Sequence, residues 1–297
     1  MNALTAGFHT DIPFEDYCQL KLLNASTICY GLVSLKHLKA ALDGEISKDS
    51  SDMNVGRAIH ARLLEPELYR TKYKVSRGCE APLQSGARKG QLCGSKAKAL
   101  LPSGKFACGK HTDQEASPDL LSAEEAENVE KAAQAVMAHP VVRLLRQEGG
   151  YETTAVFDRE GVPCKMRMDK WIPGHPAIVD VKKIRSGRGT LWTIEKDILD
   201  YHYDAKAAWY VEGAKILTGV APAFVWIFVE DSAPHDVRVI QADPETLAIG
   251  AAKVNDVFLR YRRAVEENVW PGYSNDIEWG GVPMFEKQRY RHVTGAA

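Results

Sequence analysis

The chain has 297 residues, of which 45% are hydrophobic and 26% are charged, and its formal net charge is −1; this allows one large globular domain or two small ones with a sizeable core. Because the chain is not basic overall, a nucleic-acid partner would need a local basic patch. It contains no apolar run of about 18 residues and does not start with a basic segment followed by an apolar core, so we expect no membrane span, no signal peptide and a cytoplasmic protein with reduced cysteines.

The N-terminal quarter predicts two helices after an irregular stretch. Residues 1–20 lack a periodic pattern, and we expect irregular structure there. The polar sequence around Asn24 offers an N-cap for a helix over residues 28–42, where apolar residues recur at helical spacing. Residues 53–68 predict a second helix, on which His60 lies beside an apolar stripe. A lone histidine in that setting is more often a packing or surface residue than a metal ligand.

Residues 76–118 differ from their surroundings, because they are rich in Gly, Lys, Ser and Pro and show little periodicity. The segment is too polar to build its own core, yet it carries Cys and His residues, and each Cys adjoins a Gly, as tight metal-binding turns require. We predict a structural Zn²⁺ site; the alternative is a disordered basic insertion with incidental cysteines. The predicted ligands are Cys79, Cys93, Cys108 and His111. Seven Lys and Arg residues also make this insertion a basic patch that could follow DNA phosphates.

The middle of the chain predicts a helix followed by a sheet. Ser122 and Glu125 form a capping box that opens a helix to about residue 138, and a further helical stretch covers residues 141–147. Glu160-Gly161 is typical of a hairpin turn between the first two strands. The three predicted strands span residues 151–158, 162–172 and 177–184.

Charged residues interrupt two of these apolar strands. Asp169 lies in the second, and Asp180 and Lys182 lie in the third as D-x-K. Side chains alternate along a strand, so Asp180 and Lys182 share one face, and a hairpin could bring Asp169 beside them. Two carboxylates and an amine suit a divalent metal with a charge stabiliser for phosphate chemistry. D-x-K alone is usually a solvated face, but apolar neighbours predict a buried strand here, where charges need a partner or a metal.

The last third of the chain predicts a loop, two further helices and two further strands. Residues 185–200 read as a mobile basic loop, in which Arg185 and Arg188 could contact phosphates, and residues 204–218 as a helix. Asp243-Pro244 predicts the start of a long helix. The two strands that finish the sheet are predicted over residues 221–230 and 237–242.

These elements predict an α/β fold of the mixed α+β type, with a central mixed sheet flanked by helices. The predicted parts are an N-terminal helical part over 1–75, an insertion over 76–118, a core over 119–274 and a tail over 275–297. We expect three aromatic residues to pin the tail in places, namely Trp279, Phe285 and Tyr290.

Four segments in order resemble one family. Asp169 followed by IVDVKK resembles the core of PD-(D/E)XK nucleases. The further segments are VGRAIHARLLEPELY at 55–69, YHYDAKAAWYVEGA at 201–214 and WPGYS at 270–274, which resemble RecE-type exonucleases (exodeoxyribonuclease VIII) of phages and prophages. The resemblance covers roughly residues 14–274 apart from the insertion, and the ordered set is specific although D-x-K alone is weak. The chain departs from the family at Lys206, where Gln is usual.

The resemblance implies a PD-(D/E)XK restriction-endonuclease-like core and roles for single residues. The implied ligands for Mg²⁺ or Mn²⁺ are the side chains of His60, Asp169 and Asp180 and the carbonyl oxygen of Val181. Lys182 would orient or help deprotonate the attacking water and stabilise charge. Glu152 would lie near the metals in a secondary role, unless it is only an exposed strand-end acid. Lys206 and Tyr210 would contact DNA, or Lys206 would mark a partly lost motif.

The implied activity is metal-dependent digestion of one strand of linear double-stranded DNA, 5′-to-3′, for phage-type recombination. The implied partners are DNA ends, a single-strand annealing protein and further copies of the chain, in the cytoplasm of a bacterial host. Two alternatives stay open: a DNA-binding protein on a nuclease scaffold without turnover, and an endonuclease. The cysteines do not match the iron–sulfur pattern of other PD-(D/E)XK exonucleases, so we expect no cluster.

Overall fold

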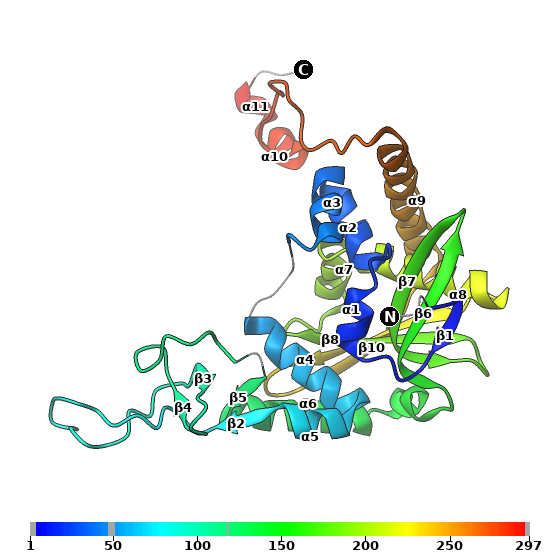
Figure 1. Cartoon of the computed structure of the whole chain (residues 1–297). Helices are drawn as coiled ribbons and strands as arrows, with labels where there is room; N and C mark the ends of the chain where they lie inside the picture. The colour runs from blue at the N-terminus through cyan, green and yellow to red at the C-terminus, as the bar shows by residue number, and fades with distance from the viewer. Residues whose placement is uncertain (1–3, 47–50, 118, 295–297) are drawn as a thin grey trace.

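The computed structural model describes residues 4–46, 51–117 and 119–294 (Figure 1), so the predicted boundary at residue 118 lies outside the described residues. A six-stranded sheet forms its centre, in the order β1-β6-β7-β8-β9-β10. Neighbouring strands are antiparallel except β8 and β9, which are parallel. The strands are β1 (Gly7–His9), β6 (Gly150–Arg159), β7 (Val162–Ile172), β8 (Ala177–Ile184), β9 (Ala223–Glu230) and β10 (Val237–Gln241). The prediction of a mixed sheet is confirmed, and the predicted strands are correct within two residues.

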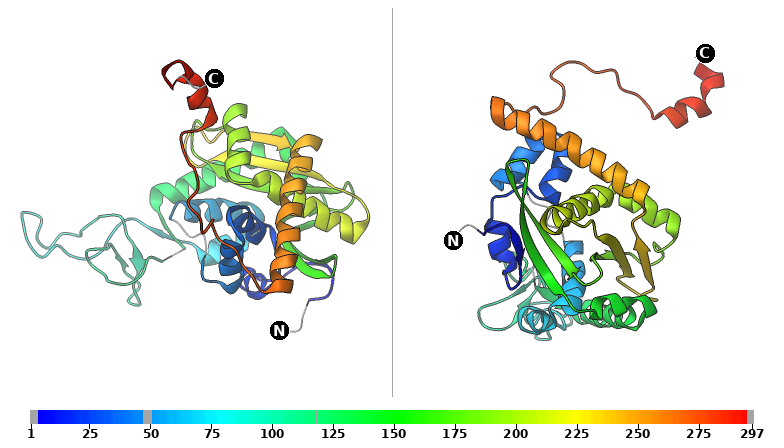
Figure 2. Two further views of the ribbon diagram at one scale, coloured as in Figure 1. Left: turned by 90° about the horizontal axis from the view of Figure 1, so that it is seen from above. Right: turned by 90° about the vertical axis from the view of Figure 1, so that its right-hand side faces the viewer.

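Helices cover both faces of the sheet (Figure 2). Alternate residues of β8 point to opposite faces: Ile178 and Ile184 pack into one core, and Val179 and Val181 into another. The first core is shared with α2 (Ala25–Val33), α3 (Leu35–Asp43), α8 (Tyr203–Thr218) and α9 (Pro244–Glu267). The second is shared with α4 (Ser51–Leu64) and α6 (Ala123–Ala138). Helix α6 begins at the predicted capping box of Ser122 and Glu125. No helix in the described part of the chain is both long and apolar enough to span a bilayer.

The prediction of irregular structure over residues 1–20 is wrong for Gly7–His9, which form a strand, and for Phe14–Gln19, which form a helix. β1 pairs with β6, and α1 (Phe14–Gln19) lies over the buried Lys165. The Lys165 Nζ donates to the backbone oxygens of Tyr17 at 2.7 Å and Leu20 at 2.6 Å. These elements are too short to show periodicity, and tertiary contacts hold them in place.

Two predicted helices are each divided by a capping residue. Ser34 has extended backbone and ends α2, and its Oγ accepts the His37 N–H at 3.2 Å to begin α3. Glu65 leaves helical geometry, with φ −134° and ψ 64°, because proline follows it, and Pro66 opens α5 (Pro66–Lys72). The helical periods were predicted correctly, and the breaks were missed because polar residues inside an amphipathic pattern look like exposed helix positions.

The predicted mobile loop over residues 185–200 contains a helix. Thr190 accepts the Thr193 N–H at 3.3 Å and caps α7 (Leu191–Asp200). The expected pinning of the tail is also wrong, because Trp279 is 104% exposed and Phe285 67% exposed. The tail instead carries α10 (Met284–Arg289) and α11 (Arg291–Thr294), which extend away from the body (Figure 1).

Residues 77–117, called the arm from here on, project from the body beside α5 and α6 (Figure 1). The arm leaves from β2 (Lys74–Ser76) and returns through β5 (Leu120–Ser122), and these two strands pair in parallel. Within it β3 (Ala99–Leu100) pairs with β4 (Phe106–Ala107). After α6 the chain passes through a 3₁₀ segment, η1 (Pro140–Arg146), into the sheet.

Candidate metal centre

The site lies where strands β7 and β8 separate. They pair only through residues 170–172 of β7 and 177–179 of β8. The next residues in register would be Asp169 and Asp180, but the ladder stops before them. The Asp169 Oδ2 instead accepts the Val181 N–H at 2.7 Å, so a side chain replaces the missing backbone partner. The opening leaves both aspartates outside the β7–β8 ladder, between two central strands of the sheet.

Glu152 faces Asp169 across the neighbouring strand pair. The register that joins Tyr151 to Lys170 and Thr153 to Met168 places Glu152 opposite Asp169. The φ angle of Glu152 is +46°, in the left-handed region that costs a non-glycine residue about 1–2 kcal/mol. Strained backbone of this kind concentrates at functional sites. The strain turns the glutamate away from ordinary strand geometry and toward the aspartate.

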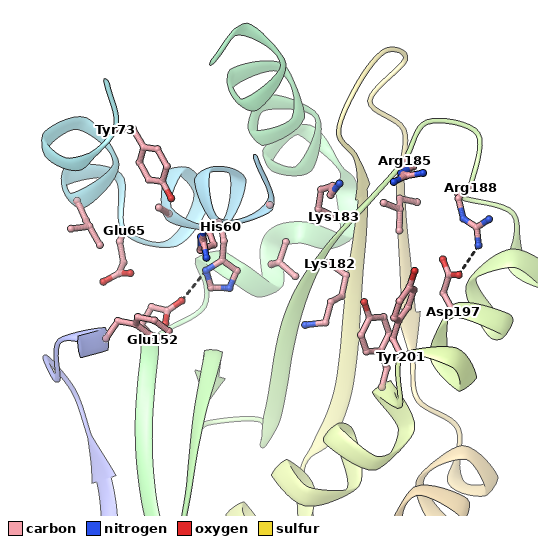
Figure 3. Close-up of a pocket in the computed structure, with 18 of the residues that line it drawn as sticks. His60, Glu65, Tyr73, Glu152, Lys182, Lys183, Arg185, Arg188, Asp197 and Tyr201 are labelled. Atoms are coloured by element: carbon pink, nitrogen blue, oxygen red, sulfur yellow. Dashed lines mark hydrogen bonds and ion pairs between the residues drawn. The ribbon is translucent and has the colours of Figure 1, made fainter. Parts of the chain in front are cut away.

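His60 of α4 joins these two carboxylates. Its Nδ1 lies 3.0 Å from Glu152 Oε1 (Figure 3). Its Nε2 lies 2.8 Å from Asp169 Oδ2. One ligand atom from each of the three residues lies within 4.8 Å of the others. The structure therefore brings His60 and Asp169 together, and Glu152 lies with them, while their role as metal ligands stays a prediction. We call these three residues the trio.

The trio has the charge and donor atoms of a cation site. Burial opposes the protonation of His60, but the charges of Asp169 and Glu152 and its hydrogen bonds to them outweigh this and raise its pKa to about 10. Burial likewise opposes ionisation of Asp169, yet His60 lowers the Asp169 pKa. Apart from the His60 imidazole at 3.0 Å, the buried Glu152 Oε1 has no polar partner among the described residues. A divalent ion held by one imidazole and two carboxylates would replace the histidine proton, and this donor set suits Mg²⁺ or Mn²⁺.

Asp180 and Lys182 form a pair beside the trio. They project from the same face of β8, as predicted, with Asp180 Oδ2 2.5 Å from Lys182 Nζ. Burial and the charge of Asp169 raise the pKa of Asp180, although Lys182 opposes this. Burial favours a neutral Lys182, but the two aspartates raise its pKa instead. Asp180 does not belong to the group of three residues whose ligand atoms lie close together. The Val181 N–H donates to Asp169, and the predicted role of the Val181 carbonyl oxygen as a metal ligand stays a prediction.

Arg167 is a site residue that the sequence interpretation missed. It is 8% exposed, its Nε lies 2.5 Å from Glu152 Oε2, and its guanidinium also donates to the Ile12 carbonyl at 2.6 Å and Thr154 Oγ1 at 3.3 Å. It therefore fixes the second oxygen of Glu152 and leaves the first toward His60. A signal was available, because Arg167 stands two residues before Asp169 in a strand and must share its face.

A pocket of about 1010 Å³ opens over two members of the trio, His60 and Glu152, between α4 and α5 on one side and α7 on the other. Lys182 extends into it from β8, toward the side on which His60 and Glu152 lie (Figure 3). Seven Lys and Arg residues and four Asp and Glu residues line the pocket. A wall with this excess of positive charge suits a polyanion. The pocket also contains Glu65, whose pKa is raised by burial and by the charge of Glu152.

The predicted DNA contacts lie at different places. Arg185 and Arg188 line the pocket, although Arg188 is already ion-paired with a carboxylate of α7 at 2.6 Å. The Lys206 Nζ lies 5.2 Å from the ring centroid of Tyr203, which lines the pocket too. Tyr210 does not line it; burial and the nearby acids raise its pKa, so its hydroxyl stays protonated beneath the site. Contact with DNA stays a prediction for all four.

The predicted zinc ligands also come together, in the arm. Ligand atoms of all four lie within 4.8 Å of one another. They are Cys79, Cys93, Cys108 and His111. The sequence spacing of these residues is wide, and short hairpins of the arm close the distance.

Residues 18–280 match the family described as a PDDEXK-like domain of unknown function (DUF3799). A crystal structure of a protein from Eubacterium rectale, provisionally named an exonuclease, is similar with a TM-score of 0.61 at 15% identity, and covers 94% of this chain and 98% of that chain. That identity shows a common fold alone. A crystal structure of SSO0001 has 16% identity over 46% of this chain and 68% of that chain, and its TM-score of 0.27 carries no argument. No protein with a curated description matches the chain. With a family match over most of its length and the mixed sheet of that fold, the chain belongs to the PDDEXK-like domain family (DUF3799), in the PD-(D/E)XK nuclease superfamily.

Proposed function

We propose that the protein is a metal-dependent deoxyribonuclease of the RecE type that digests linear double-stranded DNA from its ends, 5′-to-3′. The observation that carries this proposal is the trio of His60, Glu152 and Asp169 beside the Lys182 amine in a basic pocket. Membership in the PD-(D/E)XK nuclease superfamily supports the proposal that the protein hydrolyses phosphodiester bonds. The resemblance to RecE-type exonucleases supports the finer points: direction, a single-strand annealing partner, a homo-oligomer and a phage-type recombination role in a bacterial cytoplasm.

His60, Glu152 and Asp169 would hold Mg²⁺ or Mn²⁺, with Asp180 and the Val181 carbonyl as the further ligands that the resemblance implies. The ion would polarise the scissile phosphate and lower the pKa of a bound water. The trio itself contributes net negative charge, which favours binding of a divalent cation over a neutral occupant.

Lys182 has a role that its electrostatics define. Because its pKa is raised by Asp180 and Asp169, its side chain is an ammonium ion at neutral pH. An ammonium cannot accept a proton from water, so of the two predicted roles the structure favours charge stabilisation over general-base catalysis. Lys182 would neutralise charge that develops on the phosphate oxygens.

Arg167 would act as a positioning residue. It holds one Glu152 oxygen and is itself fixed by Ile12 and Thr154, so it presents the other oxygen to the ion. Outer contacts of this kind orient metal ligands and commonly affect metal affinity or activity by about 10–100-fold.

The experiment is digestion of end-labelled linear duplex DNA with Mg²⁺ or Mn²⁺. We expect release of nucleotides by the wild type, loss of release in Asp169→Asn, and full release in Asp256→Asn, which alters an exposed acid of α9. Asparagine can still accept the Val181 N–H, so the fold should persist. Tight binding without release by the wild type would favour the DNA-binding alternative, which the Lys206 departure supports.

Two substrate comparisons address the finer points. Covalently closed circular DNA should resist digestion, and fragments from the circle would instead indicate an endonuclease. Duplexes with a label at either end, and with a 5′-phosphate or a 5′-hydroxyl, should lose the 5′-terminal label first. Loss of the 3′-terminal label first would reverse the proposed direction.

A further inference from the structure

The arm lacks a hydrophobic core of its own. Among its described residues, the buried apolar side chains are those of two alanines and two cysteines: Ala99, Ala107, Cys79 and Cys108. Leu92, at the far hairpin, is 58% exposed. Burial of so little apolar area cannot offset the conformational entropy of ordering about 40 residues. Some other interaction must hold the arm in its folded form.

The two buried cysteines belong to a four-residue cluster. Nδ1 of His111 lies 3.3 Å from the sulfur of Cys79 and 3.4 Å from the sulfur of Cys108, and the sulfurs of Cys93 and Cys108 are 3.9 Å apart. All six cysteines of the chain are free thiols. A tetrahedral ion with Zn–S bonds near 2.3 Å and a Zn–N bond near 2.0 Å separates its ligand atoms by about 3.5–3.8 Å. The observed separations fit that geometry.

The backbone brings these ligands together through tight turns. The Cys79 N–H donates to the Ser95 carbonyl at 2.8 Å, and the Gly94 N–H donates to the Cys79 carbonyl at 3.0 Å. Gly78 has φ +129°, and a Cβ there would lie 2.7 Å from the Gly94 oxygen, so only glycine allows this approach. The His111 N–H donates to the Cys108 carbonyl at 2.9 Å, which closes the C-x-x-H turn.

One outer contact also points to a bound cation. Ser95 Oγ lies 3.2 Å from the Cys93 sulfur. The Cys93 thiol is the donor in this contact; once a cation displaces its proton, the Ser95 hydroxyl can donate to the thiolate instead and stabilise its charge, as outer partners do around metals. The closed set of four protein ligands leaves no position for a substrate, which distinguishes a structural site from a catalytic one.

We infer that Cys79, Cys93, Cys108 and His111 bind one Zn²⁺ ion, which holds the arm in its folded form. This inference does not depend on nuclease activity. Zinc binding would supply the free energy that the missing core does not, as in other small domains that fold only with metal.

The test is elemental analysis of the full-length reduced protein, expressed with zinc in the medium. We expect about one zinc per chain, lost in Cys108→Ser and retained in Cys18→Ser, which alters an exposed cysteine outside the arm. Asp169→Asn should also retain the zinc, because this variant alters the trio and not the arm. Loss of zinc in Asp169→Asn would instead mean that the zinc was bound at the trio. The inference would be overturned if the wild type contained no zinc, or if Cys108→Ser contained as much zinc per chain as the wild type.

A second measurement needs no variant. A chelator that removes the zinc should accelerate hydrogen exchange in peptides from residues 77–117 by at least about tenfold, with exchange in the central sheet unchanged. Unchanged exchange in the arm after zinc removal would refute a structural role. Iron in place of zinc, or a disulfide between Cys93 and Cys108 in the purified protein, would each refute the assignment of the ion.

Discussion

Replacing Gly250 with alanine tests the close crossing of α8 and α9. A Cβ atom at this position would lie 2.2 Å from the backbone oxygen of Asp204 and 2.5 Å from its carbonyl carbon. These atoms belong to the first turn of α8 and cannot rotate away as a side chain could, so the helices would have to separate. Overpacking of this kind costs about 1–3 kcal/mol, and alanine restores about 1 kcal/mol of helix propensity. With a clash against backbone, we expect a net loss of about 2 kcal/mol.

Gly56→Ala is the matched control for this prediction. Gly56 is also inside a helix, but its Cβ would meet only the Lys183 Cβ at 3.6 Å, an ordinary contact. We expect Gly56→Ala to stabilise the protein by about 0.5–1 kcal/mol. Urea unfolding of both variants and the wild type should show midpoint shifts in opposite directions with unchanged slopes. If Gly250→Ala were as stable as the wild type, the proposed rigidity of this helix crossing would be wrong.

Four further predictions concern the site, the arm and one buried charge. Arg167→Met should reduce Mg²⁺-dependent nuclease activity by about 10–100-fold, and a high Mg²⁺ concentration should restore part of that activity. Activity that does not increase at high Mg²⁺ concentration would contradict a positioning role. Lys182→Met should lower the cleavage rate by about 10²–10³-fold in single-turnover assays while DNA binding in Ca²⁺ persists. Replacing both Arg88 and Lys89 with Glu should weaken DNA binding and reduce the dependence of the binding constant on salt concentration. Unchanged binding and salt dependence would show that this part of the arm does not contact DNA. Burial lowers the pKa of Lys165 from 10.5 to about 8, so Lys165 contributes a rise in unfolding free energy with pH across that window. His60, whose pKa is raised from 6.5 to about 10, contributes a fall over most of the same window. The Lys165 contribution should therefore appear as a difference in pH dependence between the wild type and Lys165→Met, and identical pH dependence in the two proteins would contradict it.

Much of the fold follows from local patterns. Alternation of apolar residues predicts the strands around Asp169 and Asp180, and the Glu160-Gly161 turn joins the first two strands as expected. The same alternation places Asp180 and Lys182 on one face, where they form an ion pair. His60 depends on the resemblance instead, because nothing in its own helix shows that it faces a carboxylate.

The rest of the site depends on register and on tertiary contacts. The position of Glu152 opposite Asp169 follows from the pairing of β6 with β7, which a strand pattern alone does not specify. The contact of Arg167 with the Ile12 carbonyl joins residues 155 positions apart, beyond any local pattern. The glycines and basic residues that precede α7 favour a loop, although Thr190 is a typical N-cap.

The arm is attached to the body in a way that makes it separable. Its two ends meet in the parallel pair β2 and β5, with Ser76 in register with Ser122 and Lys74 with Leu120. The gap from the end of one strand to the start of the other is therefore about 8 Å. Because a connection between parallel strands must reverse direction twice, a linker of about a dozen residues between Ser76 and Leu120 could replace the whole excursion. Evolution or protein engineering could accordingly gain, lose or exchange this module while the sheet and its helices remain as they are.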